Sequence, residues 1–254
     1  NILILQMKQF LSFGNERFIK SRKRIKEEAE KIGLFDNVIV ETETICEEEP
    51  FKTISNKIDK KWGTGRGFYW YMWKPYIIDK TLSKLNNDDI LFYNDCGMQI
   101  FSERLDVVNK FKHLFELVQD KEVCPSGIAT FITQGSLNER KEYMYNLVQI
   151  FKHFNVEKDE SITHTQQCQA GVIIIRKCEE SVKIIQNWFN LALENPEYFV
   201  GDKRVHDKYK KEVQFKGFRD HRHDQSVWSV LCKLNNVNIL GHNLNPIYQT
   251  RRRE

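Results

Sequence analysis

The feature that most constrains the fold is a series of short apolar runs, each separated from the next by a longer segment with helical periodicity. Apolar runs this short are typical of strands buried inside a sheet. Their alternation with amphipathic helices predicts one α/β domain with a single, mostly parallel twisted sheet flanked by helices. The expected strands are residues 2–5, 38–40, 90–93, 128–132, 172–175 and 237–240. The expected helices are residues 19–32, 75–85, 105–115, 182–192 and 227–234, and the expected loops are residues 41–49 and 195–222.

Composition narrows the class of protein. The apolar start at residues 2–5 is far shorter than the roughly 20 residues that span a bilayer, and it lacks the flanks of a signal peptide. The six cysteines show no CxxC spacing, which indicates reduced thiols and predicts a cytoplasmic protein, in the host cytoplasm if the source is viral. A net charge of +4 suits a phosphate-bearing ligand but is small for a nucleic-acid-binding protein.

Polar residues adjoin three of the predicted elements. Residues 94–97 follow the strand at 90–93, residues 166–171 precede the strand at 172–175, and residues 221–225 precede the helix at 227–234. Ligands of open α/β sheets bind outside the carboxyl ends of the strands, so these clusters are candidates for one pocket. Asp95 directly follows a strand and is well placed to bind a cation or a sugar hydroxyl. Capping of a turn is the alternative interpretation of this residue.

Four segments resemble, in order, the signature of a glycosyltransferase family found in bacterial surface-polysaccharide clusters and in large DNA viruses. They are GFYWYMWKPY at residues 67–76, DILFYNDCG at 89–97, QAGVII at 169–174 and HRHDQS at 221–226. The resemblance extends from about residue 13 to residue 246. It also invites a more distant comparison with glycosyltransferase family 8.

The resemblance implies a GT-A fold in which residues 1–254 form a single domain. Residues 1–100 would be the nucleotide-binding half, and residues 101–254 the donor-sugar and acceptor half. The implied activity is transfer of a hexose-type sugar from a UDP- or GDP-sugar to a hydroxyl of a glycan or glycoprotein, as in polysaccharide biosynthesis. Neither a nucleic-acid partner nor a transmembrane segment is implied.

The resemblance also implies a set of donor-binding residues. Asp95 matches the first Asp of the DxD motif that holds a divalent metal, Mn²⁺ or Mg²⁺, but Gly97 replaces the second Asp. The metal requirement is therefore an open question at this point. Lys74 matches an Arg near the diphosphate, and Arg66 is a second candidate cation. A further pair, Gln169 and Ala170, matches a step that contacts the donor sugar.

Asp224 and Gln225 match an Asp-Gln pair that flanks the anomeric carbon in family 8, and they are the candidate catalytic residues. Cleavage of the sugar–phosphate bond develops positive charge at that carbon and negative charge on the diphosphate, which Lys74, Arg66 and any metal would stabilise. In an inverting enzyme Asp224 would be the general base. In a retaining enzyme Gln225 would lie beneath the sugar, and analogy with family 8 favours retention.

Other interpretations remain open at the sequence level. The glycines of residues 63–67 could cradle a phosphate or form a plain flexible turn, because they match no dinucleotide or P-loop fingerprint. The spacing of His221, His223, His242 and Cys232 fits no common zinc site. A sugar-nucleotide-binding protein without transfer activity is one alternative function. The other is a nucleic-acid-binding module that uses the aromatic residues near Trp70 for stacking.

Overall fold

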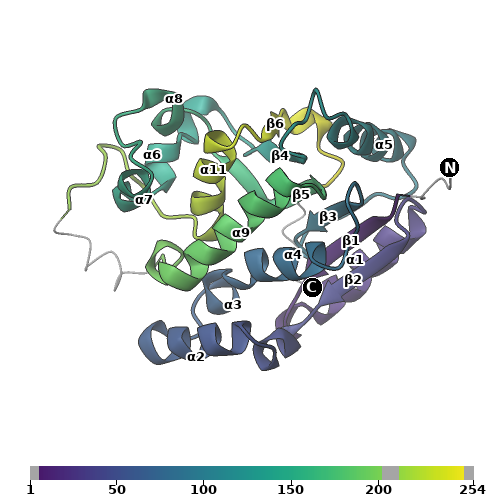
Figure 1. Ribbon diagram of the computed structural model, residues 1–254, viewed down its shortest axis with the longest axis horizontal. Coiled ribbons are helices and arrows are strands. Elements are labelled where there is room, and N and C mark those ends of the chain that lie inside the picture. Colours follow the sequence, from purple (N-terminus) through teal and green to yellow (C-terminus); the bar gives the residue numbers. More distant parts are fainter. Residues whose placement is uncertain (1–5, 202–211, 249–254) are drawn as a thin grey trace.

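The computed structural model describes residues 6–201 and 212–248 and contains a six-stranded sheet with the strand order β2-β1-β3-β5-β4-β6 (Figure 1). Only β5 runs antiparallel to its neighbours, and the other three strand pairs are parallel, so the predicted mostly parallel sheet is confirmed. The strands are β1 (Lys8–Phe13), β2 (Asn37–Glu41), β3 (Ile90–Asn94), β4 (Ile128–Ile132), β5 (Cys168–Arg176) and β6 (Asn238–Leu240).

Helices cover both faces of this sheet, as Figure 1 shows. Side chains of successive strand residues point to opposite faces. Phe92 therefore packs with α1 and α5, while the neighbouring Tyr93 faces α4, α9 and α11. The α-helices are α1 (Ile19–Lys31), α2 (Phe51–Trp62), α3 (Gly67–Trp70), α4 (Trp73–Leu82), α5 (Leu105–Gln119), α6 (Glu142–Tyr145), α7 (Val148–His153), α8 (Glu160–Thr163), α9 (Glu179–Glu194) and α11 (Asp224–Leu234). Short 3₁₀ helices are η1 (Glu16–Phe18), η2 (Glu43–Glu47), η3 (Leu137–Glu139), η4 (Pro196–Tyr198) and η5 (His242–Leu244).

The antiparallel direction of β5 decides where the polar residues at its start lie. In a fully parallel sheet, residues that precede a strand lie at the edge opposite to those that follow one. Because β5 is antiparallel to β3, its first residues lie beside the carboxyl end of β3, and Asp95 N donates to the carbonyl of Gly171 at 2.9 Å. The polar clusters at residues 94–97 and 166–171 therefore meet at one edge of the sheet.

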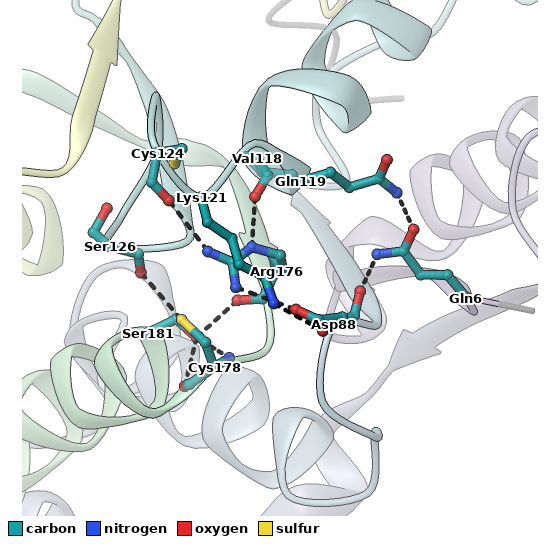
Figure 2. A network of polar contacts seen from close by, with 10 residues as sticks. All are labelled: Gln6, Asp88, Val118, Gln119, Lys121, Cys124, Ser126, Arg176, Cys178 and Ser181. Atoms are coloured by element: carbon teal, nitrogen blue, oxygen red, sulfur yellow. Dashed lines mark hydrogen bonds and ion pairs between the residues drawn. The ribbon is translucent and has the colours of Figure 1, made fainter. Parts of the chain in front are cut away.

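The opposite edge is closed by a polar network around Arg176, at the carboxyl end of β5 (Figure 2). Its guanidinium donates to the carbonyls of Val118 at 2.7 Å and Cys124 at 3.2 Å. It also forms an ion pair of 3.3 Å with Asp88, which Lys121 approaches to 3.2 Å. These contacts join β5, α5 and the turn before β3, so the network has a structural role away from the candidate site.

Several sequence predictions differ from the structure at the level of elements. The expected strand at residues 2–5 lies outside the described residues. The first described strand, β1, was missed because Gln9 and Ser12 interrupt its apolar pattern, although both are buried between β2 and β3. Helix α2 was also missed, and the expected loop at residues 41–49 contains η2 with Ile45 buried. The expected loop at residues 195–222 contains η4 in its described part.

Two further predictions concern the whole chain. Each of the six cysteines is a free thiol. Among residues 6–201 and 212–248, no helix is both long enough and apolar enough to cross a bilayer.

Candidate active site

Three residues from distant parts of the chain meet at the carboxyl end of β3. Lys74 lies in the first turn of α4, Asp95 directly follows β3, and Asp224 is the first residue of α11. The Lys74 Nζ lies 2.6 Å from Asp224 Oδ2 and 3.2 Å from Asp95 Oδ1, and it donates to the carbonyl of Ala170 at 3.0 Å. The ammonium therefore has one carbonyl as a hydrogen-bond acceptor and two carboxylates as ion-pair partners.

The lysine of this cluster is buried, and its two carboxylates differ in accessibility. Lys74 is only 2% exposed and Asp224 4%, whereas the side chain of Asp95 is 34% exposed. The hydroxyl of Tyr93, also buried, donates a short hydrogen bond to Asp95 Oδ1. Asp224 Oδ2 lies against the ammonium but has no aligned hydrogen-bond donor among the described residues, so this contact is an ion pair.

The electrostatics of the cluster follow from two carboxylates sharing one ammonium. Burial alone lowers the pKa of Lys74, but Asp224 and Asp95 outweigh it, so the pKa of the ammonium is raised above its ordinary value. Burial raises the pKa of Asp224 to about 6, with Lys74 opposing this rise and Asp95 adding to it. The raised pKa keeps the Lys74 ammonium protonated at neutral pH, while Asp224 loses its proton at a higher pH than an exposed aspartate does.

A left-handed turn supports the cluster from the side of α3. Gly67 and the four residues that follow it, 68–71, all have positive φ, which costs roughly 1–2 kcal/mol for each residue with a Cβ. A Cβ on Gly67 would overlap the Tyr71 ring, so only glycine fits there. The ring of Tyr71 lies over the Lys74 ammonium, 5.6 Å from it, and packs against His223, which also has positive φ. Strain of this kind concentrates at functional sites.

A pocket of about 350 Å³ opens beside Asp95. Its lining comes from the segments after β3 and β4, the start of β5, the region of α6 and the start of α11: Asp95, Met98, Thr133, Gln134, Gly135, Arg140, Tyr145, Gln167, Gln169, Gly171, Arg222 and Gln225. Four of these residues have a buried polar atom with no hydrogen-bond partner among the described residues, namely Thr133 Oγ1, Arg140 Nε, Gln167 Nε2 and Gln169 Oε1. Buried polar atoms are normally satisfied, so such a concentration indicates a place for a polar ligand or water.

The predicted site residues separate into two layers around this pocket. Asp95, Gln169 and Gln225 line it, and Gln225 Nε2 donates to Gln167 Oε1 at 2.8 Å. Lys74, Ala170 and Asp224 lie behind the lining as the buried support. Arg66 is exposed, and its charge is close enough to Tyr71 and His223 to influence their pKa values.

Five residues of the site were not predicted from the sequence as site residues. Tyr71 and Tyr93 lie within aromatic or apolar runs that also fit a plain core. Arg140 and Tyr145 belong to a segment between β4 and β5 that has no distinctive pattern. Arg222 belongs to the polar cluster at residues 221–225 that was predicted to line a pocket, but it was given no role of its own. The charge of Arg140 and its position after β4 could have indicated a site residue, whereas the spacing of apolar residues could not.

The described residues do not supply a donor set for a metal held by the protein alone. No group of three His, Cys, Asp or Glu among them could hold an ion, and Asp95 is the sole acid among the described residues that line the pocket. Space is open around Gly97, where a second Asp would lie. The metal role of Asp95 remains a prediction.

Comparisons with known proteins give matches to structures but not to sequences. No protein-family model matches the chain, and no curated protein matches it. A solved glycosyltransferase involved in the glycosylation of the major capsid of PBCV-1 is 14% identical, with a TM-score of 0.42 over 85% of this chain and 81% of that one. Mouse xyloside xylosyltransferase 1 is 11% identical, with a TM-score of 0.45 over 92% and 84%. The glycosyltransferase GlyE of Streptococcus pneumoniae TIGR4 is 14% identical, with a TM-score of 0.41 over 94% of this chain and 46% of that one. All three TM-scores are below 0.5.

Proposed function

We propose that this protein is a glycosyltransferase of the GT-A type, which moves a hexose-type sugar from a nucleoside-diphosphate sugar to an acceptor hydroxyl. The observation that supports this most is the meeting of four distant segments at one sheet edge. Each of the four segments that carry the family resemblance contributes one residue: Lys74, Asp95, Gly171 and Asp224. Lys74 contacts Asp95, Asp224 and the carbonyl of Ala170, which adjoins Gly171. The backbone amide of Asp95 donates to the carbonyl of Gly171. A chance resemblance gives no reason for these segments to converge.

The pocket suits a sugar because its unpartnered polar atoms are of both kinds. Gln169 Oε1 can accept a hydrogen bond, and Gln167 Nε2 can donate one. A sugar hydroxyl both donates and accepts, so a ring with several hydroxyls can satisfy both. A volume of about 350 Å³ lies at the lower end of the range for small-molecule pockets, which fits a monosaccharide unit.

The charge of the buried cluster suits the chemistry of glycosyl transfer. With Lys74 and both carboxylates ionised, the cluster has one net negative charge beside the pocket, and this charge would stabilise the positive charge that develops at the anomeric carbon. Lys74 would act by holding Asp95 and Asp224 in place, because the ammonium is buried and the oxygens beside it all belong to the protein. Arg66, which is exposed, is the better candidate for contact with the diphosphate.

Retention of the anomeric configuration is the stereochemical course that we propose. Gln225 lines the pocket and could lie against the sugar, whereas Asp224 is held behind it against Lys74. In this course the leaving phosphate oxygen takes the proton of the acceptor hydroxyl as the new glycosidic bond forms. Asp224 is then a positioning residue. The predicted UDP or GDP donor, glycan or glycoprotein acceptor, role in polysaccharide biosynthesis and cytoplasmic location belong to the same proposal.

A thermal-shift panel tests the proposal. UDP, GDP, CDP and their common sugar conjugates are added with and without Mn²⁺. A ligand at 100 times its dissociation constant stabilises by about 2.7 kcal/mol, which raises the melting temperature of a chain this long by several degrees. We expect one nucleotide class to do so, and the Mn²⁺ arm tests the predicted metal. No shift with any nucleotide would contradict the proposal. Binding without any sugar release would favour the non-catalytic alternative.

A further inference from the structure

Three arginines adjoin one tyrosine, Tyr145, and two of them, Arg140 and Arg222, line the pocket with it. The guanidinium carbon of Arg222 lies 4.8 Å from the centre of the Tyr145 ring, and that of Arg140 lies 5.6 Å from it. Arg140 Nη1 also donates to the Tyr145 hydroxyl at 3.3 Å. Arg140, Tyr145 and Arg222 line the pocket, although they come from the segment after β4, from α6 and from the residues before α11.

Neither guanidinium is neutralised by the described part of the chain. The arginine ion pairs found there involve Arg22, Arg24, Arg104 and Arg176 instead. Arg140 Nε is in addition buried without a hydrogen-bond partner among the described residues. Two cations gathered on one ring repel each other, so their placement is favourable when an anion joins them.

The surroundings specify the kind of anion. A guanidinium presents a planar fork of donors that matches the oxygens of a carboxylate or phosphate. Gln225, three residues after Arg222, lines the same pocket as both arginines, so a bound group would lie within the pocket and not on the outer surface. Asp95 lines the same pocket but is already paired with Lys74 and Tyr93, so it does not serve as the counter-ion of the arginines.

We propose that Arg140 and Arg222, placed over Tyr145, form an anion subsite that takes a phosphate or carboxylate group of the substrate. This inference rests on the proposed sugar-transfer function and extends it, because it predicts an acidic group on what binds here. The oxyanion has two possible sources. It is either the diphosphate of the donor or an acidic group, such as a uronate carboxylate, on a sugar.

Isothermal titration of the full chain with inorganic pyrophosphate, glucuronate and glucose distinguishes these sources. The variants are Arg140→Gln and Arg222→Gln, and the matched control is Arg104→Gln, whose arginine is exposed and pairs with Asp106 away from the pocket. Wild type should bind one of the two anions more tightly than neutral glucose. Each pocket variant should weaken that binding roughly tenfold to a hundredfold, and the control should leave it unchanged.

The outcomes separate the subsite from the function. Weakened pyrophosphate binding assigns the subsite to the donor diphosphate, and weakened glucuronate binding assigns it to an acidic sugar. Wild-type affinities in both pocket variants, or no preference of wild type for an anion over glucose, would overturn the subsite. If Arg222→Gln does not fold, Arg222→Lys keeps the charge without the fork and should lose part of the affinity. If anion binding depends on the arginines but no sugar nucleotide binds or reacts, the subsite stands and the proposed transferase fails.

Discussion

At the scale of single residues, the buried ammonium of Lys74 holds the site together. Lys74→Met would leave Asp224 buried without its partner, which typically costs about 3–5 kcal/mol. The control is Lys31→Met, since Lys31 pairs with Glu103 on the surface, where the loss of an ion pair costs about 0–1 kcal/mol. The free energies of unfolding in urea measure both. Equal losses in the two variants would show that Lys74 is an ordinary solvated lysine.

A double variant separates stability from activity at the same place. Replacement of a buried ion pair by apolar residues of similar size is often neutral. Lys74→Met combined with Asp224→Leu should therefore recover much of the stability that Lys74→Met loses, while sugar transfer stays abolished. Transfer at the wild-type rate in the double variant would remove the pair from the mechanism.

His223 gives the stability of the protein a pH dependence with a definite sign. Burial lowers the pKa of His223 from 6.5 to about 4, although its Nδ1 donates to the carbonyl of Phe199. Between these values the unfolded chain binds a proton that the folded chain excludes, so stability falls as pH falls, by up to roughly 3 kcal/mol. Asp224 acts in the opposite sense, because its folded pKa of about 6 lies above its ordinary 3.8 and the folded chain binds the proton first.

Comparison with His223→Asn isolates the histidine from Asp224 and from all other titrating groups. Asparagine keeps a donor near the Nδ1 position but takes up no proton. Urea unfolding at pH 7 and at pH 4.5 should show that the variant gains stability relative to wild type as pH falls. A constant difference between the two proteins at both pH values would contradict the burial-lowered pKa.

At the scale of elements, the left-handed turn before α4 depends on Gly67. Gly67 and Gly33 have nearly the same φ, +68° and +66°, but a Cβ on Gly33 would meet nothing within 4 Å, whereas one on Gly67 would overlap Tyr71. Gly33→Ala should cost about 1 kcal/mol for the backbone conformation alone. Gly67→Ala should cost more and also reduce sugar transfer, because Tyr71 must move from Lys74 and His223. Similar stability and similar transfer rates in both variants would show that the turn is not fitted to the site.

The strands show which elements a sequence can predict. Strands β3 and β5 contain the apolar runs 90–93 and 172–175, and in β4 only Thr130 is polar, because helices cover both faces of the sheet. The positions of these strands follow from that pattern. Strand β1 is buried too, but its polar residues Gln9 and Ser12 interrupt the apolar pattern by which a strand is predicted. The antiparallel direction of β5 depends on the path of the whole chain. No pattern in the residues of β5 indicates this direction.

The residues of the candidate site likewise divide into those that the sequence predicts and those that it does not. Asp95 directly follows β3, and Gln169 and Gln225 are the second residues of β5 and α11, so both the element pattern and the motif order lead to them. The burial of Lys74 cannot be predicted from a position in the first turn of a helix, where lysines are commonly solvated. Arg140 and Tyr145 come from irregular chain, and only the folded structure brings them to the pocket.

At the scale of the whole molecule, the site lies where the two parts of the sheet join. Strands β1 to β3 come from residues before 100, strands β4 to β6 come from residues after it, and the pair β3 and β5 connects them. Asp95 belongs to the first part, and Gly171, which receives its hydrogen bond, belongs to the second. A ligand bound at this edge would contact both parts.

The most direct test of the central claim is the release of nucleoside diphosphate from sugar nucleotides by wild type, Asp95→Asn and the surface control Asp106→Asn, with simple glycosides as acceptors. Wild type and the control should release diphosphate from one class of sugar nucleotide. Asp95→Asn, with an unchanged melting temperature, should be slower by at least roughly 100-fold, as expected for the loss of a charge that stabilises the transition state. No release from any sugar nucleotide, or release by Asp95→Asn at the wild-type rate, would contradict the account.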